Sequence, residues 1–330
     1  MTKKVLFALL ALMTFASAEV LAQAQLQRLY LPLKVVYHNK GFVADTCNET
    51  ADTLRIGILG KGGLAPVGVA LTFTARDADV TATPDSMDVT FRAGIGGKYA
   101  TIGVKTLTIS GTLPGVATRT LVFNTTGAAV ALNTQAAVWP YCDAIELFIE
   151  NGSGGTTTAL NDTIRYTVDA LGIYESGRFA QHLPVRYKNK GATADSALGT
   201  TIDTVRVGVT QFGDAAPLGV GVLFFAKDVD VSAAADTLLA SSFGSITARP
   251  GTFYNLATGT AFGEAFPIVS AGTATGIRTY VFNTTGAAAT RNTQATVSPY
   301  FRTLELRVAA DDAGDTTRYE IKALGIYQKN

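Results

Sequence analysis

Residues 165–174 read RYTVDALGIY, and residues 318–327 read RYEIKALGIY. These two stretches close a series of matched segments that occur in the same order in each half of the chain. Other matched segments are RTLVFNTTG at 119–127 with RTYVFNTTG at 278–286, and FTARDADV at 73–80 with FFAKDVDV at 224–231. Because the order is preserved throughout, the sequence is a tandem duplication of one unit.

The duplication sets the expected domain boundaries. Copy 1 is predicted at residues 31–174 and copy 2 at residues 183–330, and residues 175–182 form a linker between them. A linker this short predicts two domains that sit end to end with limited freedom. The chain of 330 residues is long enough for two domains of ordinary size, each with its own core.

Each copy contains short segments with the period of a β-strand. Residues 69–75, VALTFTA, alternate apolar and polar side chains, and turn signals such as GKGG at 60–63 separate such segments. A change of phase between Val104 and Leu107 indicates a bulge near Lys105. We therefore predict an all-β chain of two tandem antiparallel β-sandwich domains, jelly-roll-like, with about eight strands each.

The first 22 residues have the build of a secretory signal peptide. Lys3 and Lys4 precede an apolar run at 5–15, and small side chains make Ala18 and Ala22 the candidate cleavage sites. The run is shorter than the roughly 20 residues that a membrane helix needs. A retained anchor or a pilin-like helix is the alternative. We expect a secreted or cell-surface protein whose mature chain has no membrane span.

Both cysteines, Cys47 and Cys142, fall in copy 1. In an oxidising compartment a pair of cysteines is more often bridged than free, so a disulfide between them is predicted. Two separate buried thiols are the alternative.

The composition argues against several classes of function. The formal net charge is +1, from 27 basic and 26 acidic residues, without a basic stripe for nucleic acid. The chain has two histidines, His38 and His182, too few for a histidine-rich metal site. No nucleophile elbow, phosphate loop or metalloprotease motif occurs, so we expect no enzyme. An extracellular enzyme with a carboxylate pair is the last-ranked alternative.

Paired carboxylates recur at the end of one predicted strand in each copy. They are Asp77 and Asp79 in copy 1, and Asp228 and Asp230 in copy 2. Residues i and i+2 of a strand share a face, so each pair is a candidate Ca²⁺ site together with backbone carbonyls. Two solvated turn residues are the alternative reading.

Several asparagines fit the N-glycosylation sequon, and they would lie on the surface if they carry glycan. These positions are Asn48, Asn124, Asn151, Asn161 and Asn283. A plain turn is the alternative for the repeated NTTG segment. Trp139 has Ser298 as its counterpart, so we interpret it as a packing residue rather than a sugar platform.

Residues 23–30, QAQLQRLY, precede copy 1 and form an extension of alternating apolar residues. The extension is suited to pairing with an exposed sheet edge of the next subunit. The linker around Phe179 would make a matching contact inside the chain. The predicted assembly residues are Leu26, Arg28, Leu29, Tyr30 and Phe179.

Secretion, tandem β-domains and the lack of catalytic motifs together favour a structural role. In architecture the chain resembles the β-sandwich subunits of bacterial extracellular filaments. That resemblance implies a subunit that polymerises head to tail with copies of itself, into a filament or a surface layer. An adhesin or a carbohydrate-binding module is the alternative, and paired exposed aromatic residues in both copies would favour it.

Overall fold

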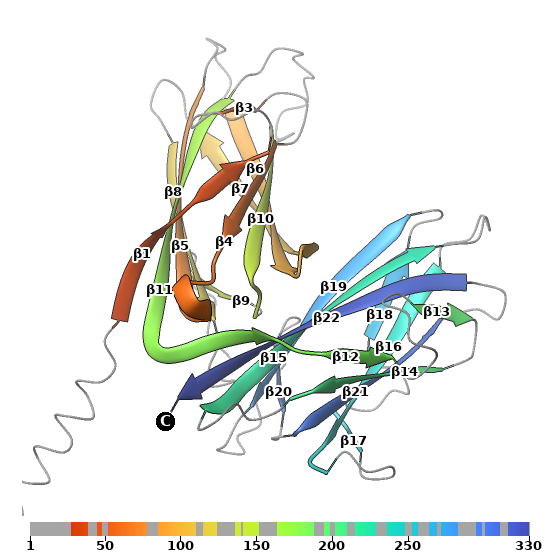
Figure 1. Cartoon of the computed structure of the whole chain (residues 1–330). Coiled ribbons are helices and arrows are strands. Elements are labelled where there is room, and N and C mark those ends of the chain that lie inside the picture. Colours follow the sequence, from red (N-terminus) through yellow and green to blue (C-terminus); the bar gives the residue numbers. More distant parts are fainter. Residues whose placement is uncertain are drawn as a thin grey trace, which may run out of the picture.

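The structure of the chain is a computed structural model (Figure 1). It describes residues 28–38, 45–47, 52–77, 85–109, 115–123, 136–139, 141–151, 164–187, 195–198, 202–209, 215–228, 236–247, 253–256, 264–268, 272–282, 295–298, 301–310 and 316–329. The predicted signal peptide therefore lies outside the described residues.

Copy 1 holds strands β1 to β11 and one short 3-10 turn, η1 (Lys61–Gly63). The strands are β1 (Arg28–Leu33), β2 (Val35–Tyr37), β3 (Asp45–Cys47), β4 (Asp52–Gly57), β5 (Leu64–Asp77), β6 (Asp85–Ile95), β7 (Lys98–Ile109), β8 (Gly115–Phe123), β9 (Ala136–Trp139), β10 (Ala144–Asn151) and β11 (Ile164–His182).

Copy 2 repeats this order. Its strands are β12 (Val185–Tyr187), β13 (Asp195–Leu198), β14 (Asp203–Gly208), β15 (Ala215–Asp228), β16 (Asp236–Ser245), β17 (Tyr254–Asn255), β18 (Glu264–Ile268), β19 (Thr273–Phe282), β20 (Ala295–Ser298), β21 (Thr303–Ala310) and β22 (Thr316–Lys329). The single long strand β7 of copy 1 corresponds to the two short strands β17 and β18, which both pair with β16. The extra length of copy 2 lies partly in the connection between β16 and β17 and partly between β17 and β18.

One sheet runs through both copies, in the order β20-β19-β15-β22-β11-β5-β8-β9, with β1 and β3 on β11 and β13 on β22. Each copy has a second sheet of its own: β2-β4-β10-β6-β7 in copy 1 and β12-β14-β21-β16-β17 in copy 2, with β18 on β16. Pairing is antiparallel except at two edges, where β9 runs parallel to β8 and β20 parallel to β19. The prediction of two tandem β-sandwiches is confirmed.

Strand β11 joins the two copies. Residues 164–173 pair with β5 of copy 1, and residues 178–182 pair with β22 of copy 2. Between them Gly177 has a φ of 79°, a conformation that glycine adopts without strain. Figure 1 shows β11 turning sharply between the sandwiches. The segment predicted as a linker is therefore paired strand, because it completes the sheet of copy 2.

Strand β1 holds the same place in copy 1 that the end of β11 holds in copy 2. Leu29 lies opposite Tyr174, and Phe179 lies opposite Tyr327, the repeat counterpart of Tyr174. Arg28 to Tyr30, expected to be available to another subunit, thus pair with β11 of their own chain. Leu26 lies outside the described residues.

Each sandwich closes over its own aromatic contacts. In copy 1, Phe73 of the long sheet meets Phe91 of the second sheet edge to face, with ring centroids 6.0 Å apart. In copy 2, Tyr280 of the long sheet meets Phe301 at 6.4 Å. Edge-to-face pairs add to the burial of apolar surface and fix the spacing of the two sheets.

The irregularity in the β6–β7 pair lies three residues before the predicted bulge. Phe91 pairs with Gly103 and Arg92 pairs with Thr101, so Ile102 is the extra residue. The prediction near Lys105 assumed an inward-facing Val104, but that side chain is 63% exposed. Among the described residues, no helix has the length and apolar character to cross a bilayer.

Candidate functional site

Strand β15 is buried on both faces, which distinguishes it from an ordinary outer strand of a sandwich. Val222 and Phe224 belong to the core of copy 2, whereas Leu223 between them is 0% exposed and belongs to the apolar cluster of copy 1. Copy 1 therefore packs on the outward face of the copy 2 sheet. The copy 2 docking face consists of Leu223, Ile277, Val281, Leu324 and Ile326. Burial of each aliphatic side chain contributes about 1.5–3 kcal/mol.

Two loops of copy 1 approach this face, and we name them the copy 1 tip: residues 94–98 and 141–143. The turn between β6 and β7 is tight because Gly96 and Gly97 have φ values of 59° and 80°. Asp143 braces the turn, since the Gly96 N–H donates to its Oδ2 at 2.7 Å. The Asp143 N–H in turn donates to the carbonyl of Gly94 at 2.9 Å.

The contact between the copy 1 tip and the copy 2 docking face is named the joint. Polar contacts surround its apolar part. Lys98 Nζ lies 3.6 Å from Glu320 Oε2 and 4.1 Å from the ring centre of Phe225. His182 Nε2 lies 3.3 Å from Asp143 Oδ2. These groups are partly exposed, so each contact contributes about 1 kcal/mol or less, and they orient the joint more than they stabilise it.

The backbone of Tyr141 comes unusually close to β15. A Cβ on Gly221 would lie 2.2 Å from the carbonyl oxygen of Tyr141, and a Cβ on Gly219 would lie 2.6 Å from its ring. The Tyr141 N–H donates to Thr279 Oγ1 at 3.3 Å. Glycine at position 221 is therefore required for the copy 1 tip to approach this closely.

Arg178 is buried in the joint, with 1% of its surface exposed, and its guanidinium carbon lies 5.7 Å from the ring centre of Tyr141. Burial lowers the pKa of Arg178 and raises the pKa of Tyr141. The counterpart in β1 is Arg28, an exposed residue that forms an ion pair with Glu175 at 3.4 Å. The same strand position is thus solvent-exposed in copy 1 and enclosed in copy 2.

Copy 1 has the same outward face, but more of it reaches solvent. Leu171 is 37% exposed, whereas its counterpart Leu324 is 0% exposed. Two aliphatic residues of the copy 2 docking face, Leu223 and Ile277, have threonine as their counterpart in copy 1. The corresponding positions in copy 1 are Thr72, Thr118, Val122, Leu171 and Ile173.

A hollow of about 830 Å³ opens on this face of copy 1, and we name it the copy 1 hollow. It lies where the chain crosses from β1 to β2, between the β1 pairing that ends at Ala170 and the β3 pairing that ends at Tyr166. Its lining includes Pro32, Lys34, Ala70, Thr72, Thr167, Asp169 and Leu171.

The counterparts of these lining residues in copy 2 are the residues that meet the copy 1 tip. The pairs are Ala70 with Gly221, Thr72 with Leu223, Thr167 with Glu320, Asp169 with Lys322, and Pro32 with His182. The Lys322 side chain passes 3.5 Å from the position of a Cβ on Gly96. The copy 1 hollow is thus the open equivalent of the place that the tip fills in copy 2.

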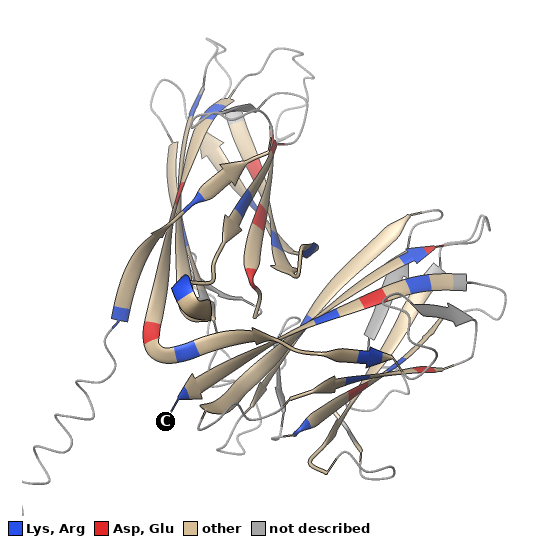
Figure 2. Cartoon of the chain, viewed as in Figure 1, with Lys and Arg blue, Asp and Glu red and all other residues tan. Residues whose placement is uncertain are grey.

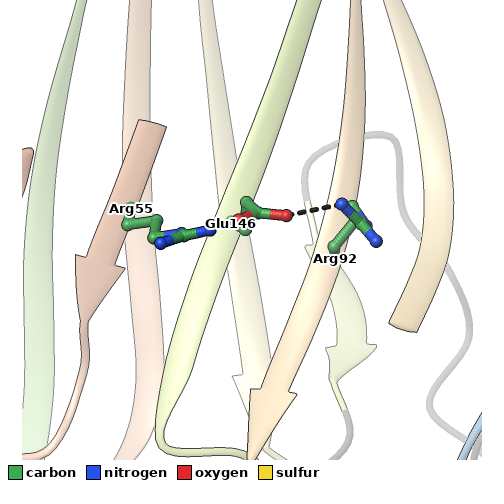
Figure 3. A network of polar contacts seen from close by, with 3 residues as sticks. All are labelled: Arg55, Arg92 and Glu146. Atoms are coloured by element: carbon green, nitrogen blue, oxygen red, sulfur yellow. Dashed lines mark hydrogen bonds and ion pairs between the residues drawn. The ribbon is translucent and has the colours of Figure 1, made fainter. Parts of the chain in front are cut away.

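A second cluster lies on the outward face of the other sheet of copy 1 (Figure 3). Glu146 is 2% exposed; its Oε2 accepts from Arg55 Nε at 2.7 Å and its Oε1 from Arg92 Nη1 at 2.6 Å. Arg55 lies over the ring of Tyr99 at 5.0 Å, and Arg92 lies over Phe148 at 5.9 Å. The hydrogen bond to Glu146 raises the pKa of Arg55.

Copy 2 builds the same cluster with two residues exchanged. Glu305 lies 2.8 Å from Arg206 Nη2 and 3.3 Å from Arg307 Nε. Arg307 lies 4.0 Å from the ring centre of Phe243, and Arg206 lies 4.9 Å from that of Phe253. In copy 1, Arg92 lies on β6 and Phe148 on β10. In copy 2 the two residue types have exchanged places, because the phenylalanine lies on β16 and the arginine on β21. Each copy thus has a buried carboxylate, two arginines and two aromatic rings on one outward face.

The predicted calcium ligands fall mostly outside the described side chains. Asp228 is buried, with 3% exposed, and Asp77 ends β5. Asp79, Asp230 and the Asp77 side chain lie outside the described residues. In the part of the chain that the structure describes, no group of three metal-ligating side chains occurs. The calcium site therefore stays a prediction.

The disulfide and glycosylation predictions also remain open. Cys142 is buried in the copy 1 core, with 1% exposed, and the Cys47 side chain lies outside the described residues. Asn151 ends β10, and its side chain is not among those described. The other sequons, Asn48, Asn124, Asn161 and Asn283, lie outside the described residues.

Of the predicted assembly residues that the structure describes, Arg28, Leu29 and Tyr30 lie in β1, and Phe179 lies in β11. Leu29 and Tyr30 are 48% and 55% exposed, and Phe179 stacks on Tyr327 with ring centroids 5.4 Å apart. Sequence reasoning missed the copy 1 tip and the copy 2 docking face. The available signal was the replacement of threonine by aliphatic residues, as at Thr72 and Leu223, between otherwise matched strands.

No family model and no curated protein sequence matches the chain. Among solved structures, the CBM22-1–CBM22-2 tandem domain of Paenibacillus barcinonensis Xyn10C is 7% identical, with 91% of this chain and 93% of that chain covered and a TM-score of 0.25. A triple jelly-roll protein of an archaeal virus is 10% identical, with 92% and 60% covered and a TM-score of 0.21. The single CBM22-1 xylan-binding domain of the same Xyn10C is 9% identical, with 44% and 85% covered and a TM-score of 0.23. TM-scores this low support no conclusion about a ligand or partner.

Proposed function

We propose that the chain is an extracellular structural subunit that assembles head to tail with copies of itself. One observation supports this most: the copy 1 hollow is the open counterpart of a face that the same chain covers in copy 2. The natural occupant is the end of copy 2 that corresponds to the copy 1 tip. The proposal includes no catalytic step.

The end of copy 2 has the same backbone frame as the copy 1 tip. The Arg302 N–H donates to the carbonyl of Ser245 at 2.9 Å, as Asp143 does to Gly94, and the Arg302 carbonyl accepts from Val209 at 2.7 Å. We name residues 244–247 and 301–302 the copy 2 tip. Ile246 in this tip is 59% exposed, whereas its counterpart Ile95 is fully buried.

A contact between the copy 2 tip of one chain and the copy 1 hollow of the next uses two different surfaces. Such a heterologous contact leaves one tip and one hollow free at the ends, so it extends to an open filament unless its rotation closes a ring. Most residues of the strands are uncharged, and the charged ones are scattered over both copies (Figure 2). Long-range repulsion between subunits is therefore weak.

The joint between chains would be weaker than the joint within the chain. Thr72 and Thr118 offer less apolar surface than the aliphatic residues of the copy 2 docking face. Ala70 also carries a Cβ where Gly221 has none, so an incoming tip must stand further from the sheet. Assembly should accordingly depend on protein concentration and be reversible.

The test uses the chain cleaved after Ala22, examined by sedimentation velocity over a concentration series and by negative-stain electron microscopy. Leu171→Asp should abolish assembly and leave the melting temperature nearly unchanged, because Leu171 is 37% exposed. Val104→Asp is the matched control, since Val104 is 63% exposed on another sheet. A wild-type chain that stays monomeric at every concentration would overturn the proposal.

Carbohydrate binding is a second candidate, favoured by the outward cluster that both copies share. Charged planar groups beside aromatic rings suit the hydroxyl groups and apolar faces of sugars. Retardation of the chain in gels that contain soluble polysaccharides would support this function if Arg55→Ala together with Arg206→Ala removed it. Unchanged migration in a panel of plant and bacterial polysaccharides would contradict it.

A further inference from the structure

The two tips differ in the sign of one charge, and the two receiving faces differ in the opposite sense. Asp143 in the copy 1 tip corresponds to Arg302 in the copy 2 tip. Lys322 beside the filled site in copy 2 corresponds to Asp169 in the copy 1 hollow. Arg302 in the copy 2 tip and Asp169 in the copy 1 hollow are both exposed.

Inside the chain both Asp143 and Lys322 lie close to Gly96, and Lys322 Nζ forms an ion pair with Glu320 Oε1 at 2.7 Å. The Gly96 N–H donates to Asp143 Oδ2 at 2.7 Å, and the Lys322 side chain passes 3.5 Å from the position of a Cβ on Gly96. His182 adds a second basic group, 3.3 Å from Asp143. The copy 1 tip thus presents Asp143 to the basic group of His182, beside a separate contact in which Lys98 of the tip meets Glu320.

We infer that Arg302 of one chain pairs with Asp169 of the next, and that this reversed charge pair sets the order of contacts in the assembly. The inference rests on the proposed head-to-tail function and names the contact that gives it direction. Lys34 is the basic group that also lines the copy 1 hollow, at the position of Pro184 in copy 2. It would face solvent or the rim of the incoming tip.

The reversal excludes both wrong pairings. A copy 1 tip that approached a copy 1 hollow would bring Asp143 toward Asp169, and a copy 2 tip that approached a copy 2 face would bring Arg302 toward Lys322. Like charges at a contact select against a partner more effectively than opposite charges increase its affinity. Only the copy 2 tip matches the copy 1 hollow in charge, so chains add in one direction.

The test is a charge exchange in the full mature chain, read by sedimentation velocity at low and high salt. Arg302→Asp alone and Asp169→Lys alone should each weaken self-association about tenfold or more at low salt, and less at high salt. An equal mixture of the two variants should associate, because each tip then meets a hollow of opposite charge. The double variant should associate alone.

Two control variants separate this effect from a general change of net charge. Arg186→Asp and Glu150→Lys make the same charge changes at exposed positions away from the tips and should associate like the wild type. If the wild-type chain associates and both single variants do so equally well, the charge pairing is overturned while head-to-tail assembly stands. If the wild type does not associate, assembly itself is overturned. Unchanged melting temperatures show that the variants fold.

Discussion

The outward face of the long sheet is built twice in this molecule, once covered and once open. The residues that face the two cores match closely: Val69 and Phe73 in copy 1 correspond to Val220 and Phe224 in copy 2. The residues that face outward do not match, since Thr72 becomes Leu223 and the exposed Leu171 becomes the buried Leu324. A repeat can therefore gain a permanent neighbour through changes on one face, while the strand register and the core stay as they were.

Threonine is the residue that makes this possible. Its branched side chain favours an extended backbone as valine does, and its hydroxyl can be hydrated when nothing covers it. An aliphatic residue at the same place requires a cover or leaves an exposed apolar patch. The Thr-rich face of copy 1 therefore tolerates both the free and the docked state, and the aliphatic face of copy 2 tolerates only the docked state.

The largest effect should follow from closing the gap at the covered face. In Gly221→Ala the new Cβ would lie 2.2 Å from the Tyr141 carbonyl oxygen, so the copy 1 tip must move away from β15. We expect a loss of about 2–4 kcal/mol in the free energy of unfolding, from overpacking and from exposure of the docking face. Differential scanning calorimetry measures it.

Gly208→Ala is the matched control, because a Cβ on Gly208 meets nothing within 4 Å. It should leave the melting temperature within about 2 °C of the wild type. If Gly221→Ala were equally silent, the close approach of the copy 1 tip would be wrong. The converse change, Ala70→Gly, should deepen the copy 1 hollow and strengthen association between chains.

A medium effect should follow from exchanging the arginine and phenylalanine of the outward cluster. Arg92→Phe alone leaves Glu146 with one cation and should cost about 1–2 kcal/mol in the free energy of unfolding. Adding Phe148→Arg recreates the copy 2 arrangement in copy 1 and should restore most of the loss. Urea unfolding of the single and double variants gives the coupling energy.

The matched control is Glu305→Gln in copy 2, which weakens both ion pairs there and should cost a similar amount. Two independent, additive losses from Arg92→Phe and Phe148→Arg would contradict the idea that the two clusters are one design in two arrangements.

The smallest effect concerns the pH dependence of the joint. Burial raises the pKa of Asp143 above its unfolded value, and the Gly96 N–H and His182 offset this only in part. A raised folded pKa contributes stability below the unfolded pKa, and that contribution is lost as the pH rises through the folded pKa. Asp143→Asn should therefore raise the melting temperature by about 1–2 °C at pH 7.

The difference in melting temperature between the Asp143→Asn variant and the wild type should vanish below about pH 4, where the aspartate is protonated. Thermal unfolding followed by circular dichroism from pH 3 to pH 8 measures both limits. A variant less stable than the wild type at pH 7 would show that the contact with His182 outweighs the burial of the carboxylate.

Much of the fold could be predicted from the sequence, because strand alternation and turn residues are local signals and the duplication doubles each of them. The sandwich class follows from these signals. The strand shared by the two copies was predicted only in part, because residues 23–30 were expected to pair with the sheet edge of the next subunit, whereas β1 pairs with β11 of its own chain. The linker around Phe179 was expected to make a matching contact inside the chain, and residues 178–182 do pair with β22 as residues 28–33 pair with β11.

The candidate site was harder to predict, because alternation identifies one buried face and says nothing of the other. The run VGVLFFA at residues 220–226 is apolar on both faces, which is the mark of a doubly buried strand. Its copy 1 counterpart, VALTFTA at 69–75, alternates. Which part of the molecule covers Leu223 depends on the bend at Gly177, and that bend is a tertiary property.

Each sandwich is closed by pairing its first strand with its last, and this has a consequence for the time course of folding. Arg28 and its ion-pair partner Glu175 are 147 residues apart, and Ser176 and Gln328 are 152 apart. Contacts this distant form late. Until β1 pairs with it, β11 has one open edge. During that time β1 of the same chain and β1 of a neighbouring chain would compete for that edge. A high concentration of folding chains would then favour exchange of β1 between chains, and dilution would favour the closed monomer.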